Sequence, residues 1–398
     1  MLNESYKLYD KLCEIRRTLH NCPETGFALE KTFNTVWNLL VDIGYKPQKC
    51  GKKGIVATIG NIKGRCVLLR ADMDALPIKE DEYSSEKVSG CEENMHACGH
   101  DMHTTMLIGA AILLKKYENE LNGCVKLMFQ PAEEILMGAK DMIDNGVLES
   151  PEVNYALMIH VLTNISLKTG SAIFSPPGAG APSADYFKVT VSGKGGHGAM
   201  PSQCRDALLS SAYIIASLCE INARELSFGE KALITVGKIN SSGEANVISE
   251  KVSFEGTLRT YSEETRLNIK KRISEISNNI AAAFLTRAET SFGGGAPLLI
   301  NDKELSEKVT NYTRELLGCE KVIEIKNEEK NGAEKNQGSE DFAHISHRVP
   351  SIMIALAAGN ISDGYNVGLH NSKTRFDEGA LPVGAAIYAY NAMQLLNS

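Results

Sequence analysis

The amino-acid sequence predicts an α/β fold, a mixed sheet covered by helices, with a compact ferredoxin-like α+β domain inserted into it. Three observations predict this class. Apolar runs rich in branched residues alternate with helical patterns near both ends of the 398-residue chain. The middle of the chain instead has the order strand, helix, strand, strand, helix, strand, which is typical of a ferredoxin-like unit. Stretches of small and turn-forming residues flank that middle segment, as is typical of hinges.

The two outer parts of the chain predict one discontinuous α/β domain. Short apolar runs such as "CVLLR" and "CVKLMF" predict buried strands, and a longer periodic stretch predicts a helix between them. The strands are expected at 55–59, 66–69, 125–129 and 155–159, and the helix at 104–117. The alternation resumes late in the chain, with a helix at 303–317, a strand at 351–356 and a closing helix at 379–396.

The inserted segment lies between "SPPGAGAPSA" and "GGGAP". Its expected elements, in order, are a strand at 185–191, a helix at 206–225, strands at 233–239 and 251–259, a helix at 263–285 and a strand at 288–292. We therefore expect residues 1–183 and 295–398 to form the outer domain and residues 184–294 to form the insert. A chain of this length exceeds what one ordinary hydrophobic core supports, which agrees with two domains.

Composition and charge argue against several classes of function for this chain. Hydrophobic residues make up 43% and charged residues 23% of the chain, as in a globular protein, and the net charge of -7 argues against a nucleic-acid or acidic-membrane partner. No stretch reaches the ~18 continuous apolar residues of a membrane span, and the charged N-terminal stretch lacks the apolar core of a signal peptide. The ten cysteines are scattered without disulfide spacing, so we expect reduced thiols in a cytoplasmic protein.

Residue types that bind metals gather in a few short segments. "HACGHDMHTT" contains Cys98 and His100 two positions apart, with His103 one turn later at the start of a helix. "FQPAEE" ends a predicted buried strand with Glu133 and Glu134, at the kind of position where ligands collect in open α/β sheets. Each residue taken alone has a simpler explanation, because histidines and thiols are common in cores and acidic pairs are common at helix starts.

Two further histidines belong to the same predicted domain. His160 ends the strand in "ALMIHV", and His370 lies in a polar loop before the last helix. Together with Cys98, His100 and Glu134 they make five ligand-type groups, more than one tetrahedral zinc ion needs. Their mixed nitrogen, oxygen and sulfur donors, and the absence of paired CxxC spacing, favour an open two-metal hydrolytic site over a closed structural zinc site.

Six motifs along nearly the whole chain carry a family resemblance: "RADMDALPIKE", "HACGHDMHTT", "FQPAEE", "GKGGHGAMP", "GSEDF" and "LHNSKTRFDE". In type and order they resemble those of the N-acyl-amino-acid amidohydrolases, which include hippurate hydrolases and plant auxin-conjugate hydrolases. That family belongs to the wider aminoacylase and glutamate carboxypeptidase group of metallopeptidases. The resemblance implies a catalytic domain with two metal ions and an inserted lid domain, the same organisation that the strand order predicts.

The resemblance implies a ligand role for five residues of the outer domain. They are Cys98, His100, Glu134, His160 and His370, with the thiolate of Cys98 between two divalent ions. The expected ions are zinc or manganese, with cobalt or nickel as alternatives, because the affinity order of these metals does not decide which one is loaded in cells.

The resemblance also implies the reaction and its general base. Glu133 would take a proton from a metal-bound water that attacks the amide carbonyl and would return it to the leaving amine. In the wider group the position of Asp101 often carries a bridging carboxylate; here we expect Asp101 to support the ligands instead. Asp74 resembles the aspartate that orients a ligating histidine elsewhere in the group, and we expect the same of it.

In the inserted lid, the resemblance implies three residues that act on the substrate. His197, in "GGHG", corresponds to a histidine that reaches the active site of the neighbouring subunit and polarises the scissile carbonyl. Asn246 and Arg259 correspond to residues that hold the substrate carboxylate, a task that suits a planar guanidinium. The alternative for Arg259 is a solvated strand arginine, and Ser249 replaces the family's usual proline. The implied assembly is a homodimer through the lid, with a tetramer as the alternative.

The expected function is metal-dependent hydrolysis of an N-acyl amino acid, hippurate-like or acetylated, to a carboxylic acid and a free amino acid. A dipeptidase or an N-acetyl-diaminopimelate deacetylase would use the same residues, and the motifs do not distinguish these substrates. A non-catalytic protein that binds metal or conjugates is the alternative from another class; the presence of Glu133 and all five ligands argues against it. A redox protein built on Cys98 would need a second cysteine at CxxC spacing, which is absent.

Overall fold

The computed structural model describes residues 1–81, 93–325 and 338–398, and these form two compact units. Unit 1 comprises Met1–Gly180 and, from Ile300 on, the rest of the chain apart from a short segment that ends at Glu340. Unit 2 comprises Ala181–Leu299 and that segment. The chain therefore changes unit at 180/181 and 299/300, a few residues from the boundaries expected at 183/184 and 294/295.

Unit 1 is built on an eight-stranded mixed sheet with the order β1-β2-β4-β3-β5-β16-β6-β15. The strands are β1 (Gln48–Cys50), β2 (Gly54–Gly60), β3 (Cys66–Asp72), β4 (Cys124–Gln130), β5 (Tyr155–Leu162), β6 (Ala172–Phe174), β15 (Val322–Glu324) and β16 (Ser351–Ala357). The four central strands β4, β3, β5 and β16 are mutually parallel, and β2 and β6 pair antiparallel with the two sides of this block. The central strands are the apolar runs of the sequence, which agrees with a parallel block buried on both faces.

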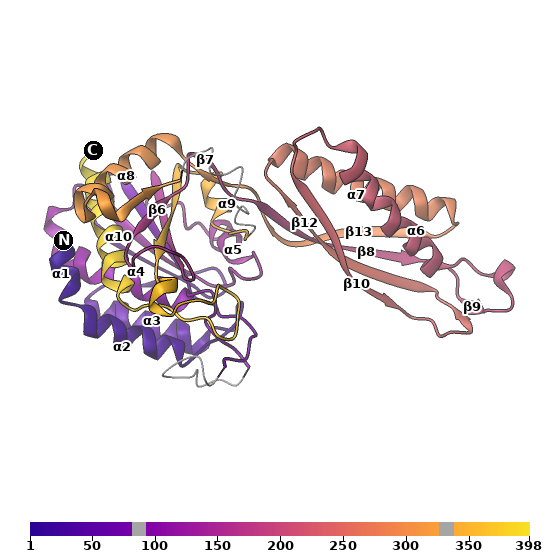
Figure 1. Cartoon of the computed structure of the whole chain (residues 1–398), viewed down its shortest axis with the longest axis horizontal. Helices are drawn as coiled ribbons and strands as arrows, with labels where there is room; N and C mark the ends of the chain where they lie inside the picture. The colour runs from indigo at the N-terminus through magenta and orange to yellow at the C-terminus, as the bar shows by residue number, and fades with distance from the viewer. Residues whose placement is uncertain (82–92, 326–337) are drawn as a thin grey trace. The chain divides into compact units, whose positions relative to one another are not determined.

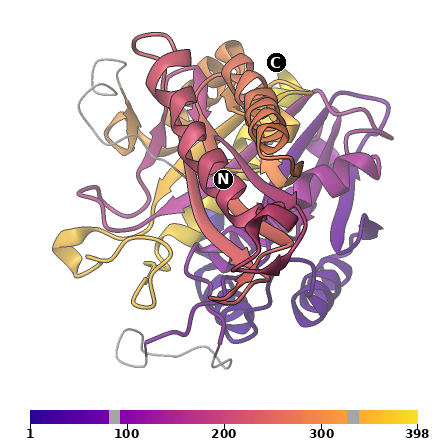
Figure 2. The ribbon, with the colours of Figure 1, turned by 90° about the vertical axis from the view of Figure 1, so that its right-hand side faces the viewer.

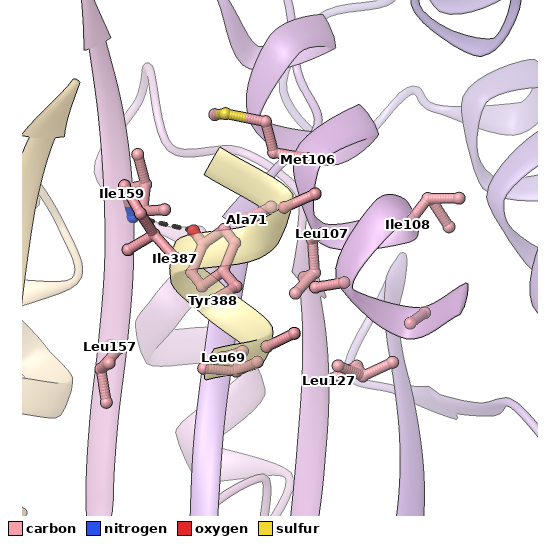
Figure 3. Close-up of a cluster of buried hydrophobic side chains, with 14 of the residues drawn as sticks. Leu69, Ala71, Met106, Leu107, Ile108, Leu127, Leu157, Ile159, Ile387 and Tyr388 are labelled. Atoms are coloured by element: carbon pink, nitrogen blue, oxygen red, sulfur yellow. Dashed lines mark hydrogen bonds between the residues drawn. The ribbon is translucent and has the colours of Figure 1, made fainter. Parts of the chain in front are cut away.

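The helices of unit 1 are α1 (Leu2–Tyr6), α2 (Tyr9–His20), α3 (Glu30–Ile43), α4 (His100–Lys116), α5 (Gly138–Asp144), α8 (Lys303–Leu317), α9 (Ala343–Ser346) and α10 (Ala380–Asn397). α4 and α10 pack against each other, and Figure 3 shows their apolar side chains in one cluster with those of three central strands. Tyr388 of α10 joins this cluster to the sheet, because its hydroxyl donates to the Arg70 carbonyl at 2.6 Å and accepts from the Ile159 N–H at 2.8 Å.

The parallel strands bring polar residues to one edge of the sheet. β3 ends at Asp72, β4 ends at Gln130, and β5 carries His160 near its end. Since the carboxyl ends of parallel strands meet at the same edge, the turns that follow them also lie together. This edge holds the candidate site.

Unit 2 has the order β8 (Ser183–Ser192), α6 (Ala207–Glu220), β10 (Ala232–Ser241), β12 (Lys251–Thr260), α7 (Glu263–Ala283) and β13 (Arg287–Ala296). Its four-stranded sheet is antiparallel, with the strand order β10-β12-β8-β13. α6 and α7 lie side by side on one face of this sheet (Figure 1), and Figure 2 shows the same two helices in front of the strands. The predicted ferredoxin-like insert is therefore confirmed.

The helices of unit 2 begin where capping side chains are present. The Asp206 carboxylate accepts the N–H groups of Leu208 and Leu209 at the start of α6, and the Ser262 hydroxyl caps α7. α6 ends at Glu220, and residues 221–225 form a wider turn, whereas the sequence predicted one helix over 206–225. Along α7 the buried isoleucines recur at helical spacing, which directs one face of the helix to the sheet.

The remaining expectations concern cysteines and membranes. The nine cysteines that the structure describes are all free, and Cys91 lies outside the described residues. Within 1–81, 93–325 and 338–398, no helix combines the length and the apolar character needed to cross a membrane.

Candidate metal centre

Cys98 and His100 lie on either side of the start of α4. Gly99 between them has a φ of 86°, in the left-handed region that favours glycine. A Cβ at Gly99 would lie 2.5 Å from Val161 Cγ2, so a larger residue would displace β5. The helix begins at His100 and not at the expected residue 104, because the left-handed turn at Gly99 separates the segment before it from the helix.

Glu133 and Glu134 lie in a tight turn directly after β4. Ala132 enters this turn at a φ of 56°, a conformation that L residues rarely adopt. The two carboxylate oxygens of Asp74 accept the backbone N–H groups of Glu133 and Glu134, at 3.0 and 3.2 Å. Asp74 was expected to orient a ligating histidine; its Oδ1 lies 3.6 Å from His100 Nδ1, so its direct hydrogen bonds are to the turn.

His160 presents one defined ring nitrogen to the site. Its Nδ1 lies 2.8 Å from the Val161 carbonyl oxygen, which can only accept, so Nδ1 carries the proton. Nε2 therefore keeps its lone pair, and this atom lies 3.7 Å from Cys98 Sγ. A neutral imidazole with a free Nε2 lone pair is the form that binds a metal ion.

His370 comes to the same place from the other end of the sequence. Its backbone has a φ of 59°, and its N–H donates to the Ala97 carbonyl at 3.0 Å. Its Nε2 lies 3.2 Å from Cys98 Sγ and 3.7 Å from Glu134 Oε1. The side chain is 53% exposed, so the site is open to solvent on this side.

The five predicted ligands lie together in unit 1. Their donor atoms fall within 4.8 Å of one another in overlapping sets: Cys98 with His100 and His160, Cys98 with Glu134 and His370, and His100 with Glu133 and Glu134. Neighbouring nitrogen and sulfur ligands of a tetrahedral ion with bonds of ~2.0 to 2.3 Å lie roughly 3.3 to 3.7 Å apart. The Cys98 sulfur belongs to two sets, so this donor set suits two ions that share the thiolate.

Two buried ligand atoms lack a partner of their own. His100 Nε2 lies 3.8 Å from Glu134 Oε1, too far for a hydrogen bond, and neither atom has a hydrogen-bond partner among the described residues. Buried polar atoms in native proteins are nearly always satisfied, by protein, water or an ion. The residues present therefore fit metal ions that would be bound at these two atoms.

The pKa shifts of the site residues indicate that ligation would need additional positive charge nearby. Burial raises the pKa of Cys98 well above its usual range, with a further contribution from the Glu134 carboxylate, and burial raises the pKa of Glu134 to about 7. Burial lowers the pKa of His160 to about 3, whereas at His100 the Asp72 carboxylate outweighs burial and raises the pKa well above its ordinary value. Divalent cations would favour the deprotonated thiolate and carboxylate, since ligation requires those forms.

Asp101 does not face the predicted ligands. Its carboxylate accepts from Arg16 Nε at 2.8 Å and lies 2.9 Å from His20 Nδ1, both on α2. Consecutive residues of a helix point about 100° apart, so His100 faces the strand ends while Asp101 faces α2. We expected Asp101 to support the metal ligands. In the structure it instead forms an ion pair that joins α4 to α2.

Sequence reasoning missed Asp72 as a residue of the site. Asp72 is fully buried at the end of β3, with Oδ1 2.6 Å from His103 Nδ1 and Oδ2 3.7 Å from His100 Nε2. Two features of the sequence could have identified Asp72: it is an acidic residue that ends a buried strand, two positions before Asp74, and a second histidine, His103, follows His100 by one helical turn.

In unit 2, the structure brings His197 and Asn246 together. His197 lies in β9 (Gly196–His197), which pairs with β11 (Val247–Ile248), and the Gly198 N–H donates to the Asn246 carbonyl at 2.9 Å. The Ala199 N–H donates to His197 Nδ1 at 3.1 Å, so the neutral ring carries its proton on Nε2. His197 is exposed and presents an N–H donor.

Arg259 lies in β12 of the four-stranded sheet, at the end of that strand remote from the β9–β11 pair. It pairs with Ala184 at the start of β8, whereas Lys251, near Asn246 in the chain, pairs with Ser192 at the end of β8. Eight residues of strand span roughly 26 Å, so Arg259 and the His197–Asn246 pair do not meet within one chain. The Arg259 Nη1 donates to Ser339 Oγ at 2.6 Å, so this arginine is more than a solvated strand residue.

An α/β sheet whose strand ends gather imidazole, thiol and carboxylate donors beside a buried glutamate, with a ferredoxin-like insert, defines a metal-dependent amidohydrolase. A family model agrees with this class over most of the chain. The chain belongs to the peptidase family M20/M25/M40, whose model matches residues 68–394.

Relatives of known activity and solved structures resemble the chain along nearly its whole length. It is 35% identical to the IAA-amino acid hydrolase ILR1-like 2 of Arabidopsis thaliana, over 99% of this chain and 87% of the relative. It is 34% identical to the N-acetyl-L-cysteine deacetylase of Bacillus subtilis, over 98% and 89% of the two chains. A Bacillus subtilis structure described as a dinuclear metal binding peptidase of the M20 family matches with 26% identity and a TM-score of 0.77, over 99% of each chain. A crystal structure from methicillin-resistant Staphylococcus aureus matches with 30% identity and a TM-score of 0.87, over 100% of this chain and 98% of the other.

Proposed function

We propose that the protein hydrolyses N-acyl amino acids to a carboxylic acid and a free amino acid, with two divalent metal ions in the site at the strand ends of unit 1. The observation that carries the proposal is that the Cys98 sulfur belongs to two separate sets of metal-grade donors, with Glu133 beside them. The names of the relatives, an amino-acid conjugate hydrolase and an N-acetyl-L-cysteine deacetylase, support this substrate class.

In this proposal Cys98, His100 and His160 would hold one ion, and Cys98, Glu134 and His370 would hold the other. Two such ions would act as Lewis acids that polarise the amide carbonyl and lower the pKa of water. The donor set of thiolate, imidazole and carboxylate suits zinc or manganese, with cobalt or nickel as alternatives.

Glu133 is the proposed general base. Its side chain is buried, and Asp74 holds its backbone N–H, so the carboxylate has a defined direction. Its Oε2 lies 3.9 Å from His100 Nε2, next to both donor sets but outside them. From there it can accept a proton from the attacking water and return it to the leaving amine.

Recognition of the substrate is proposed for the residues of unit 2. His197 would donate its Nε2–H to the substrate carbonyl, while Asn246 and Arg259 would bind the substrate carboxylate. An N-acyl amino acid is much shorter than the roughly 26 Å of β12 that separates Arg259 from Lys251, which is close to Asn246 in the chain. One chain therefore cannot bring Arg259 and the His197–Asn246 pair to the same substrate. We therefore infer a homodimer in which the lid of one chain supplies His197 to the site of its partner.

Metal reloading tests this function. Chelator-stripped protein is reloaded separately with Zn²⁺, Mn²⁺, Co²⁺ and Ni²⁺, and the release of free amine is followed with hippurate, N-acetyl-L-cysteine, an indole-acetyl amino acid and simple dipeptides. Hydrolysis of an N-acyl amino acid that is lost on chelation and restored by metal is the expected result. A preference for the dipeptides would instead identify a dipeptidase, and hydrolysis unaffected by chelation would contradict the metal site.

A further inference from the structure

His103 is fully buried in the first turn of α4, and both of its ring nitrogens are engaged. Its Nε2 accepts the Val161 N–H at 2.8 Å, so this nitrogen carries no proton. The neutral ring carries its proton on Nδ1, which donates to Asp72 Oδ1 at 2.6 Å. Because this arrangement leaves no lone pair available, His103 is not itself a ligand, although it lies in one donor cluster with Asp72 and His100.

Val161 connects His103 to the proposed ligand His160. The Val161 N–H is held by His103, while the carbonyl of the same residue accepts from His160 Nδ1 at 2.8 Å. That second hydrogen bond sets the tautomer of His160 and directs its Nε2 toward Cys98. The direction of this ligand therefore depends on where His103 holds the Val161 backbone.

The His103 ring also packs against the rings of two proposed ligands. Its centroid lies 4.7 Å from that of His160, at 64°, and 5.4 Å from that of His100, at 30°. Its anchor Asp72 is held in turn by Arg70 Nη1 at 2.7 Å, and both side chains are fully buried. This close packing, together with the hydrogen bonds of His103 and His160, leaves the three rings little freedom to tilt.

We propose that His103 is a positioning residue of the metal centre. Asp72 and Val161 fix its tautomer and orientation, and His103 in turn directs Nε2 of His160 and restricts the ring of His100. The inference rests on the proposed metal site of unit 1. Groups that orient metal-binding histidines typically contribute about 10- to 100-fold in metal affinity or activity. Here the orienting group acts through the backbone of one residue, Val161, and does not contact a ring nitrogen of the ligand.

Cobalt binding tests the proposal without any assay of turnover. Chelator-stripped wild type and His103→Phe are titrated with Co²⁺ against a chromophoric chelator, and the visible and thiolate-to-cobalt absorption bands are recorded. The phenyl ring keeps the volume but loses both hydrogen bonds, so affinity should fall by about 10-fold or more and the bands should shift. The matched control is His96→Phe, because His96 is equally buried and its ring nitrogens have no hydrogen-bond partner among the described residues. This control should keep the affinity and the bands of the wild type.

Two more variants separate positioning from folding. His103→Gln can place an acceptor near the Val161 N–H and should stay within about threefold of wild-type affinity, whereas His103→Asn reaches only Asp72 and should lose affinity like His103→Phe. Equal affinities for the Gln and Asn variants, unchanged bands in His103→Phe, or an equal loss in His96→Phe would each overturn the positioning role. A wild type that binds no Co²⁺ would instead contradict the proposed function itself.

Discussion

The sulfur of Cys98 lies 3.2 Å from Nε2 of His370, although 272 positions separate the two residues in the sequence. The His370 N–H is anchored on the Ala97 carbonyl, and its backbone adopts a φ of 59°. Residues in such sparsely populated conformations cost about 1 to 3 kcal/mol and cluster at functional sites. This contact joins the C-terminal loop to the donor set around α4 and makes Cys98 the common member of two sets.

Glu133→Gln should keep the metal content of the wild type and lose turnover, because the amide cannot accept a proton from water. A general base contributes typically about 100- to 10,000-fold. Metal content by atomic spectroscopy and kcat on the best N-acyl amino acid measure the two effects. Activity within a few-fold of the wild type would assign the base elsewhere.

Cys98 should be protected from alkylation by bound metal and should become reactive on chelation, because a ligating thiolate is occupied. Peptide mass spectrometry after treatment with iodoacetamide measures the modification of each cysteine. The exposed thiols Cys219 and Cys319 are internal controls that should react equally in both states. Equal rates for Cys98 with and without metal would remove it from the site.

Mixed dimers should recover activity if the site is shared between chains. Inactive His197→Ala and inactive Glu133→Ala chains are mixed, dissociated and reassociated. In a mixed dimer, the chain with the intact Glu133 receives an intact His197 from its partner, so one complete site forms. Activity that stays at the level of the separate variants would mean that His197 acts within its own chain or not at all.

Asp101→Asn should destabilise unit 1 and leave the ligand set in place, because Asp101 pairs with Arg16 and His20 and not with the ligands. Removal of one partner of a buried ion pair costs about 3 to 5 kcal/mol. The free energy of unfolding by urea, measured on metal-free protein, tests this. Trp37, the one tryptophan of the sequence, provides the signal from α3.

The same variant has a defined pH dependence. Although burial acts the other way, Arg16 and His20 hold the pKa of Asp101 below its ordinary 3.8, so its stabilising effect is present above about pH 4 and is lost as the pH falls further. At His20, burial acts to lower the pKa, but the hydrogen bond to Asp101 outweighs it and the pKa is raised. The stability that protonated His20 contributes is therefore present below about pH 6.5 and is lost as the pH rises through the raised pKa. The difference between wild type and variant should therefore be largest between about pH 4 and pH 6.5. A difference that stays constant from pH 3 to pH 8 would contradict the ion pair.

Much of the fold could be predicted because its signals are local. Apolar runs identified the central strands, and helical patterns identified α6, α7, α8 and α10, so both the α/β class and the ferredoxin-like insert are confirmed. The start of α4 was misplaced because one glycine turn at Gly99 outweighed the periodic pattern.

The sequence alone determined which residues are candidates, because metal-grade side chains in a recognisable order are a property of the chain itself. The roles of Cys98, His100 and Glu133 stay predictions, and only the tertiary structure decided that the candidate donors meet within 4.8 Å. It also decided that Asp101 faces α2, that Asp72 and His103 are hydrogen-bonded beside the donors, and that Arg259 lies at the end of β12 remote from His197. The reason is that the direction of a side chain, and the partner of a buried polar atom, depend on strands and helices brought together from distant parts of the chain, which no local pattern encodes.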